Sequence, residues 1–261
     1  MEFLPRIAVF VSPFAINAGG LRFFYMYPFC GLNFRRNQSP SLYIAWYNAG
    51  IMEERISVSL HEEIFEVLHF WFGELSEGEL PDKEKQMTWW MKSEEFDYLV
   101  RRGFEKHVLL AEKGELSHWL EIPLGTVAFI IVVDQFPRNI YRDKRSAFSR
   151  DALALRACLE GIEKGFDMGI HPAYRVFFYL PLMHSEDIEI QCLSVEKYSA
   201  LENEYASYPK IRETLACSAD FAGRHFDIIK RFGRYPHRNA ALGRKSTLEE
   251  IEFLKEPGSS F

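Results

Sequence analysis

The stretch Ser149-Arg-Asp-Ala-Leu-Ala-Leu-Arg-Ala-Cys-Leu-Glu-Gly-Ile-Glu-Lys-Gly165 shows the pattern that decides the fold class. Its apolar residues recur three or four positions apart and so share one face of an α-helix: Ala152, Leu155, Leu159 and Ile162. Gly165 ends the pattern, as glycine commonly does after a helix. The stretch therefore predicts an amphipathic helix whose apolar face is directed to a protein core.

The same helical period continues on both sides of this stretch. It predicts helices over residues 60–72, 83–91, 94–111, 123–134, 172–180, 185–205, 211–232 and 248–255. The segment 123–134 is so apolar and β-branched that alone it also fits a strand. Pro123 at a first helical turn and the helical neighbours favour a buried helix instead. Because strands and helices do not alternate and the sequence has no glycine-rich phosphate loop, Rossmann and P-loop folds are excluded.

Consecutive amphipathic helices joined by short loops pack as antiparallel pairs. We therefore predict a single all-α domain of stacked helix hairpins over residues 59–255, with an N-terminal extension over 1–58 and a tail over 256–261. Pro181 is expected to follow the end of helix 172–180. Ser185 is expected to cap the next helix and Thr247 the last one, with Glu250 in the capping-box position.

The composition narrows the class of protein. The chain has 261 residues, 48% of them hydrophobic, and its 31 Lys and Arg against 37 Asp and Glu give a formal charge of −6. This apolar fraction is ample for a core, which excludes collagen-like, coiled-coil and disordered chains. A dedicated nucleic-acid binder needs a net basic surface, so we expect no nucleic-acid partner. Neither the composition nor the charge indicates an oligomeric state.

Residues 1–51 differ from the rest of the chain. They carry a net charge of +3 and 12 of the 40 aromatic residues, whereas the remainder has a net charge of −9. The apolar part, residues 7–32, is broken by Pro13, Asn17, Arg22 and Pro28 among others, so no membrane span is expected. A signal peptide is only weakly supported. We interpret the segment as a tail without a fold of its own or as a mis-assigned start before Met52.

The four cysteines are dispersed and form no Cys-x-x-Cys pair. This usage fits free thiols in a reducing cytoplasm. Cys158 and Cys192 fall on the apolar stripes of predicted helices, and free cysteine is among the most buried residue types. We therefore predict that Cys158, Cys192 and Cys217 are structural.

Polar residues gather in three places at helix ends. The first cluster follows helix 123–134 and contains Asp134, Arg138 and Asn139. The second is His184, Ser185, Glu186 and Asp187, followed by Gln191, and the third spans residues 231–244. Each residue taken singly has a simpler reading as a helix cap or a local ion pair, such as the i,i+4 pair Asp134–Arg138. Together, at helix ends where bundles build their sites, they indicate a binding site.

The first hypothesis is a small anionic ligand in a polar pocket, with acid–base chemistry. His184 and Glu186 would move protons, because a histidine beside a carboxylate is a common acid–base pair. Arginine binds carboxylates and phosphates bidentately. The ligand-binding candidates are Asp134, Arg138, Asn139, Arg234, His237, Arg238 and Asn239. The spacings match no metal-binding frame, so neither a metal nor another cofactor is predicted.

Five ordered motifs carry a resemblance to a known family. They are Trp71-Phe-Gly73, Asp134-Gln-Phe-Pro-Arg-Asn139, Leu180-Pro-Leu-Met-His-Ser-Glu-Asp187, Arg231-Phe-Gly-Arg-Tyr-Pro-His-Arg-Asn239, and Leu242-Gly-Arg244 with Ser246-Thr247. Over residues 60–255 the chain resembles the bacterial family catalogued as domain of unknown function 924. The resemblance implies an all-α, tetratricopeptide-like fold and implies no reaction. Lys245 departs from the family pattern, which tends to have an acid there, and residues 1–51 lie outside it.

The second hypothesis is a tetratricopeptide-like scaffold that holds a peptide without catalysis. Its groove would be lined by aromatic residues: Trp89, Trp90, Tyr174 and Phe178. The two hypotheses differ in one geometric expectation. Convergence of the polar clusters in one place favours the small-ligand site, whereas an open aromatic trough with scattered polar residues favours the scaffold.

Overall fold

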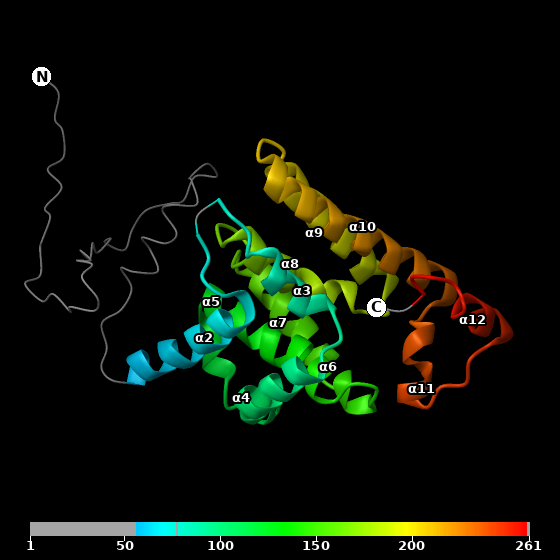
Figure 1. Cartoon of the computed structure of the whole chain (residues 1–261), viewed down its shortest axis with the longest axis horizontal. Coiled ribbons are helices and arrows are strands. Elements are labelled where there is room, and N and C mark those ends of the chain that lie inside the picture. Colours follow the sequence, from blue (N-terminus) through cyan, green and yellow to red (C-terminus); the bar gives the residue numbers. More distant parts are fainter. Residues whose placement is uncertain (1–55, 77, 260–261) are drawn as a thin grey trace, which may run out of the picture. The chain divides into compact units, whose positions relative to one another are not determined.

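The computed structural model describes residues 56–76 and 78–259. The regular secondary structure of these residues is helical (Figure 1). Contacts divide the chain into a unit over residues 1–60 and a second unit over 61–261. The second unit is all-α, which confirms the predicted class. The predicted extension 1–58 lies outside the described residues except for its last three, which already belong to the first helix described.

The helices of the described part follow the predicted order with small differences in their ends. They are α2 (Ile56–Phe72), α3 (Lys83–Trp90), α4 (Glu94–Glu112), α5 (Pro123–Ile130), α6 (Phe136–Ile140), α7 (Asp151–Glu163), α8 (Pro172–Met183), α9 (Ile188–Glu204), α10 (Pro209–Phe232), α11 (Asn239–Leu242) and α12 (Leu248–Phe253). Short 3₁₀ segments connect several of them: η1 (Ser117–Glu121), η3 (Arg145–Ala147) and η4 (Pro236–Arg238).

The core forms around α5 and α8. Every residue of α8 except Tyr174 is buried, and residues 125–130 of α5 are buried as well. Aromatic rings join these helices to their neighbours: the ring of Trp71 on α2 lies 5.6 Å from that of Phe136 and 5.7 Å from that of Phe177. Such edge-to-face contacts add to the burial of the rings. Farther along the chain, α9 and α10 lie side by side as an antiparallel pair (Figure 1).

The apolar segment 123–134 is helical, as predicted, but it is not one regular α-helix. After α5, the residues Ile131–Gln135 form a π-helical turn, η2, which leads directly into α6. The extra residue in such a turn changes which side chains face inward. Both Asp134 and Gln135 are buried as a result, at 0% and 6% exposure.

The buried face of α7 differs from the predicted one. Ala152 is exposed and Leu155, Leu159 and Ile162 are only half-buried, whereas the small residues Ala154, Ala157, Cys158 and Gly161 are buried. A Cβ atom at Gly161 would come within 2.5 Å of Phe178 Cζ. Close approach of α7 and α8 therefore requires small residues at the contact, which a hydrophobicity pattern does not reveal.

The prediction that Pro181 follows the end of helix 172–180 is wrong. Helix α8 continues through Pro181 to Met183, and the His184 N–H still donates to Leu180 O at 2.9 Å. A proline inside a helix removes one backbone hydrogen bond. Here the burial of nearly every side chain of α8 offsets that loss.

The predicted start of α9 is wrong, and its predicted apolar stripe is confirmed only at Tyr198 and Leu201 among Ile188, Cys192, Val195, Tyr198, Leu201 and Tyr205. Asp187, not Ser185, is the N-cap, because its carboxylate accepts hydrogen bonds from the Glu189 and Ile190 N–H groups at 2.8 and 3.3 Å. The buried face contains Gln191, Ser194, Tyr198 and Leu201, while Ile188 and Cys192 are exposed. Cys217 on α10 is exposed as well, and only Cys158 has the predicted burial.

The last helix is confirmed in detail. Thr247 Oγ1 accepts from the Glu250 N–H at 3.2 Å, and Glu250 Oε2 accepts from the Thr247 N–H at 2.7 Å, which is a complete capping box. Among the helices described, none combines the length and apolar character that a membrane crossing requires. Stacking of the tetratricopeptide kind remains a prediction.

Candidate active site

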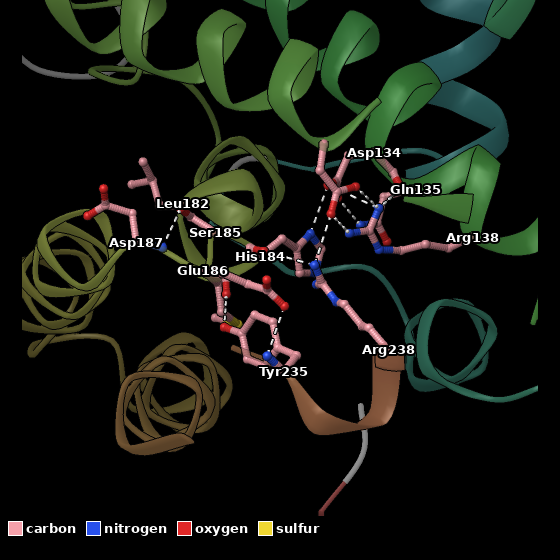
Figure 2. Close-up of polar contacts among 12 residues, drawn as sticks. Asp134, Gln135, Arg138, Leu182, His184, Ser185, Glu186, Asp187, Tyr235 and Arg238 are labelled. Atoms are coloured by element: carbon pink, nitrogen blue, oxygen red, sulfur yellow. Dashed lines mark hydrogen bonds and ion pairs between the residues drawn. The ribbon is translucent and has the colours of Figure 1, made fainter. Parts of the chain in front are cut away.

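The predicted polar residues Asp134, Arg138, His184 and Arg238 come together (Figure 2). Asp151 joins them through ion pairs with Arg138 and Arg238. We call these five residues the His184 cluster. They come from five elements of the chain. Asp134 lies in η2 and Arg138 in α6, Asp151 is the first residue of α7, His184 is the C-cap of α8, and Arg238 ends η4.

The pair at the centre of the cluster is His184 and Asp134. His184 Nδ1 lies 2.8 Å from Asp134 Oδ1, and the Asp134 side chain is fully buried. Asp134 Oδ2 accepts a hydrogen bond from Gln135 Nε2 at 2.5 Å, which holds the carboxylate from its other side. Among the described residues no group forms a hydrogen bond with His184 Nε2, and the His184 side chain is 13% exposed.

The charges of the cluster set the protonation of this pair. Burial opposes ionisation of Asp134, but the neighbouring Arg138 and His184 hold its pKa well below the usual range. Burial and the charge of Arg138 lower the pKa of His184. At neutral pH the pair is therefore a carboxylate and a neutral imidazole. Because the carboxylate can only accept, the proton is on Nδ1 and the lone pair is on Nε2.

Two arginines complete the cluster and share one carboxylate. Arg138 Nη2 donates to Asp151 Oδ2 at 3.1 Å, and Arg238 Nη1 donates to the same oxygen at 3.1 Å. Arg138 Nη1 also lies 3.3 Å from Asp134 Oδ1, which confirms the expected i,i+4 contact. Arg238 Nη1 donates to the carbonyl oxygen of His184 at 3.1 Å. The two guanidinium groups thus contact the His184–Asp134 pair, Arg238 at the His184 backbone and Arg138 at the Asp134 carboxylate.

Glu186, the predicted proton-transfer partner of His184, lies in a separate contact. Its carboxylate accepts from Arg244 Nη1 at 2.6 Å and Nη2 at 2.9 Å, and from the Tyr235 N–H at 2.8 Å (Figure 2). These hydrogen bonds outweigh burial and lower the pKa of Glu186. The carboxylate that meets His184 is Asp134 instead. Glu186 therefore holds the segment that carries Arg238 in place, a role that no local sequence pattern indicates.

The remaining predicted ligand-binding residues lie in neighbouring networks. Asn139 Nδ2 donates to Asp97 Oδ1 at 2.8 Å on α4. Arg234 forms a bidentate contact with Glu250, at 2.6 and 2.8 Å, and Asn239 Nδ2 donates to the same carboxylate at 3.3 Å. These three residues hold helices and loops together around the cluster and do not enter it.

Histidines line the side of the cluster toward α10. The ring of His225 lies 6.5 Å from that of His184 and 5.6 Å from that of Tyr235, and the ring of His237 lies 5.5 Å from that of Tyr235. Burial, with the positive charge of Arg238 nearby, lowers the pKa of His225 and of His237 to about 3. Both rings are therefore neutral at neutral pH.

Asp151 was missed in the sequence, whereas Gln191 and Arg244 stood in the predicted polar clusters without being chosen as ligand-binding candidates. Asp151 has the position of an ordinary first-turn acid on α7, so its role in joining two arginines left no local signal. Gln191 is fully buried, and its Nε2 lies within hydrogen-bond distance of the Leu182, Met183 and Ser185 carbonyl oxygens and of Tyr235 Oη. Arg244 falls in a recognised motif, which could have identified it.

Two surface hollows lie away from the cluster. The larger, about 510 Å³, is lined by residues of α2 and α4, including Phe70, Leu99 and Phe104, and the smaller, about 310 Å³, lies at the turn between α9 and α10. In the part of the chain that the structure describes, no three His, Cys, Asp or Glu side chains gather as metal ligands. Of the aromatic residues expected to line a peptide groove, Phe178 is fully buried and Trp90 is 60% exposed.

Comparisons with known proteins agree with the fold. A solved structure of a protein of unknown function from Agrobacterium tumefaciens is similar, with 31% sequence identity and a TM-score of 0.62, over 75% of this chain and 98% of that one. None of the curated proteins matches this chain. The family model for the bacterial proteins of unknown function DUF924 matches residues 67–258, a range that holds every residue of the His184 cluster. The chain therefore belongs to the DUF924 family of bacterial proteins, as its five motifs indicated.

Proposed function

We propose that this protein binds a small anionic ligand at the His184 cluster and transfers a proton to or from it through Nε2 of His184. The observation that carries the proposal is the 2.8 Å contact between His184 Nδ1 and Asp134 Oδ1, with Nε2 left without a hydrogen bond among the described residues. A carboxylate at one imidazole nitrogen fixes the ring and its tautomer and makes the other nitrogen available as a base.

Asp134 is the orienting residue in this proposal. When Nε2 takes a proton, the imidazolium gains a full charge beside a buried carboxylate, which stabilises it. The side-chain hydrogen bond from Gln135 keeps the second carboxylate oxygen in place, so the carboxylate does not rotate away from His184. Positioned general acid–base groups contribute about 10²- to 10⁴-fold to reaction rates.

Arg138 and Arg238 are the groups for an anion. Both are largely buried, at 20% and 7% side-chain exposure, and guanidinium groups in such places attract oxyanions strongly. Asp151 neutralises part of their charge in the absence of a ligand. Convergence of these residues around His184 supports a small-ligand site more than a peptide scaffold, because Phe178, expected in the peptide groove, is part of the core.

The test is a screen of the full chain against small carboxylates, phosphates and sulfate, read by thermal shift, with conversion followed by NMR. The variants are His184→Gln and, as a matched control, His118→Gln at an exposed position of η1. An anion at about 100 times its dissociation constant adds about 2.7 kcal/mol to the stability of the protein. We expect a stabilising anion whose conversion falls at least about 100-fold in His184→Gln, with both variants still binding it.

Two results would contradict the proposal. The first is that no anion stabilises the wild-type protein. The second is that His184→Gln converts the ligand at the rate of the His118→Gln control. Peptides that stabilise the wild type and His184→Gln equally, without conversion, would instead favour the scaffold.

A further inference from the structure

One edge of the Arg238 guanidinium group, formed by Nε and Nη2, makes no hydrogen bond to the described residues. Its guanidinium carbon lies 4.5 Å from the centre of the Tyr235 ring and 4.9 Å from that of the Phe148 ring, so the group is held between two aromatic faces. Both of its hydrogen bonds, to Asp151 Oδ2 and to the His184 carbonyl oxygen, are made by Nη1. Nε is buried without a hydrogen-bond partner, and no described residue accepts a hydrogen bond from Nη2.

The Nε and Nη2 groups of an arginine form a matched pair of donors. Their N–H bonds are parallel, and they bind the two oxygens of a carboxylate or phosphate side-on. Leaving a buried donor unpaired is unfavourable, so an oxyanion at this edge would supply what the folded protein lacks. Tyr235 is fully buried whereas Phe148 is half-buried, so the Phe148 side of the guanidinium group is the one nearer to solvent.

The charge balance of the cluster separates carboxylates from phosphates. The carboxylates of Asp134 and Asp151 balance the guanidinium groups of Arg138 and Arg238, and His184 is neutral. A carboxylate ligand adds one negative charge to this balanced cluster, whereas a phosphate dianion adds two. Uncompensated charge in a largely buried site is unfavourable, so the cluster favours the monoanion.

The residues that carry the anion-binding edge and the imidazole are in direct contact. Arg238 Nη1 donates a hydrogen bond to the backbone carbonyl oxygen of His184, and Figure 2 shows the Arg238 side chain reaching His184. A small molecule with a hydroxyl group next to its carboxylate has one group for each of these two residues.

We propose that the ligand is a small monocarboxylate with a hydroxyl group next to the carboxylate, a 2-hydroxy acid, bound side-on to Nε and Nη2 of Arg238 with its hydroxyl proton directed to His184 Nε2. The role of His184 in this assignment rests on the proposed function. The role of Arg238 rests on its own unpaired edge and can be tested separately.

The experiment follows the arginine Nε–H resonances of the full chain during titration with 2-hydroxypropanoate and, in parallel, with inorganic phosphate. The Arg238 resonance is assigned by its loss in Arg238→Lys, which keeps the charge but removes the edge. We expect this resonance to move to saturation with 2-hydroxypropanoate and phosphate to bind at least 10-fold more weakly. Arg238→Lys should weaken binding of 2-hydroxypropanoate at least 10-fold.

Matched variants separate the failure of this assignment from the failure of the proposed function. Arg142→Lys is the control, because Arg142 forms its bidentate contact with Asp97 outside the cluster, and it should bind as the wild type does. Binding that is equal in Arg238→Lys, or tighter for phosphate, overturns the carboxylate assignment and leaves the His184–Asp134 pair untouched. If Arg238→Lys does not fold, a titration in which no arginine Nε–H resonance of the wild type moves at saturating 2-hydroxypropanoate overturns it.

The variant His184→Gln tests the proton-transfer role of His184 separately from carboxylate binding by Arg238. We expect this variant to bind 2-hydroxypropanoate within about 3-fold of the wild type, since the carboxylate is held by Arg238. Loss of binding in His184→Gln with retained binding in Arg238→Lys would overturn the assignment of the edge. Retained binding in His184→Gln together with unchanged conversion of the ligand would support the carboxylate site and contradict the proton-transfer role.

Discussion

Arg138 and Arg238 donate hydrogen bonds to the same oxygen of Asp151, each at 3.1 Å, although they belong to α6 and η4. Two guanidinium groups in one largely buried place repel each other unless an anion lies between them. Asp151 supplies that anion and joins the C-terminal part of the domain to the central helices. The cluster is therefore a structural junction as well as a candidate site.

Replacing Asp151 with Asn should destabilise the protein by about 3 kcal/mol, because it leaves two arginines without their shared counter-charge. The measurement is urea unfolding at pH 7. Asp220→Asn is the matched control, since Asp220 and Arg224 form an exposed pair on α10, and it should cost less than about 1 kcal/mol. Equal effects of the two changes would show that the junction at Asp151 contributes little.

The buried histidines predict a loss of stability in mild acid. His225 and His237 have pKa values lowered to about 3 by burial and by positive neighbours, so the unfolded chain takes up protons below about pH 6.5 that the folded chain does not. Stability should therefore fall as the pH drops through 6.5, by up to about 1.4 kcal/mol per pH unit for each histidine. Urea unfolding between pH 7 and 5 measures the slope.

His225→Asn is the informative variant for this slope. Asn can still donate to the Phe221 carbonyl oxygen, which lies 2.7 Å from His225 Nδ1, but it does not titrate. The slope should be smaller than that of the wild type, because one of the histidines that stay neutral in the folded chain has been removed. An unchanged slope would mean that other groups cause the acid sensitivity.

Glu186 should couple to Arg244 and hardly to Arg238. Glu186 and Arg244 share two hydrogen bonds, whereas Arg238 makes its hydrogen bonds to Asp151 and His184. A double-mutant cycle on Glu186→Gln and Arg244→Gln should give a coupling of at least about 1 kcal/mol, and one on Glu186→Gln and Arg238→Gln less than about 0.5 kcal/mol. A larger coupling to Arg238 would show that Glu186 interacts with the His184 cluster.

Local sequence patterns account for the helices and their order. Periodicity, Pro123 at the first turn of α5 and the capping box at Thr247 all depend on residues a few positions apart, and the structure has each of them. The inward faces were harder to predict. The buried face of α9 contains Gln191 and Ser194, because backbone carbonyl oxygens at the end of α8 and Tyr235 provide hydrogen-bond partners for Gln191. A pattern of apolar residues in the sequence does not indicate where such hydrogen-bond partners lie.

The sequence predicts which residues belong to the candidate site better than it predicts which of them form hydrogen bonds or ion pairs with one another. His184, Asp134, Arg138 and Arg238 stand out because polar residues at helix ends are visible in the sequence. Which carboxylate meets His184 depends on contacts across 50 residues and on the π-helical turn at η2. Glu186 is nearer in sequence, but Arg244 and the Tyr235 N–H occupy its oxygens.

The exposure of the cysteines predicts a pattern of labelling. Cys192 and Cys217 are exposed, whereas Cys158 is fully buried and burial raises the pKa of its thiol. A thiol reagent added to the native protein should therefore modify Cys192 and Cys217 and leave Cys158 intact until the protein unfolds. Mass spectrometry of the digested protein assigns each site. Early labelling of Cys158 would show that the contact between α7 and α8 opens readily.

Two glycines on helices should respond oppositely to alanine. At Gly125, near the start of α5, a Cβ atom would overlap the carbonyl oxygen of Trp119 and touch the side chain of Ile122 at 3.0 Å. At Gly103, within α4, a Cβ atom would meet nothing within 4 Å. The overlap at Gly125 is with backbone, which cannot rotate away as a flexible side chain can. Gly125→Ala should therefore destabilise the protein by about 2 kcal/mol or more, by forcing α5 away from η1.

Gly103→Ala is the matched control and should stabilise the protein by about 0.5 to 1 kcal/mol, because alanine restricts the unfolded chain and favours the helix. Both changes are measured by urea unfolding. Because α5 leads directly into η2, the displacement caused by Gly125→Ala should also move Asp134 relative to His184. The imidazole nitrogen resonances of His184 should change in Gly125→Ala and stay unchanged in Gly103→Ala. Unchanged resonances in both variants would mean that the position of Asp134 does not depend on how α5 packs against η1.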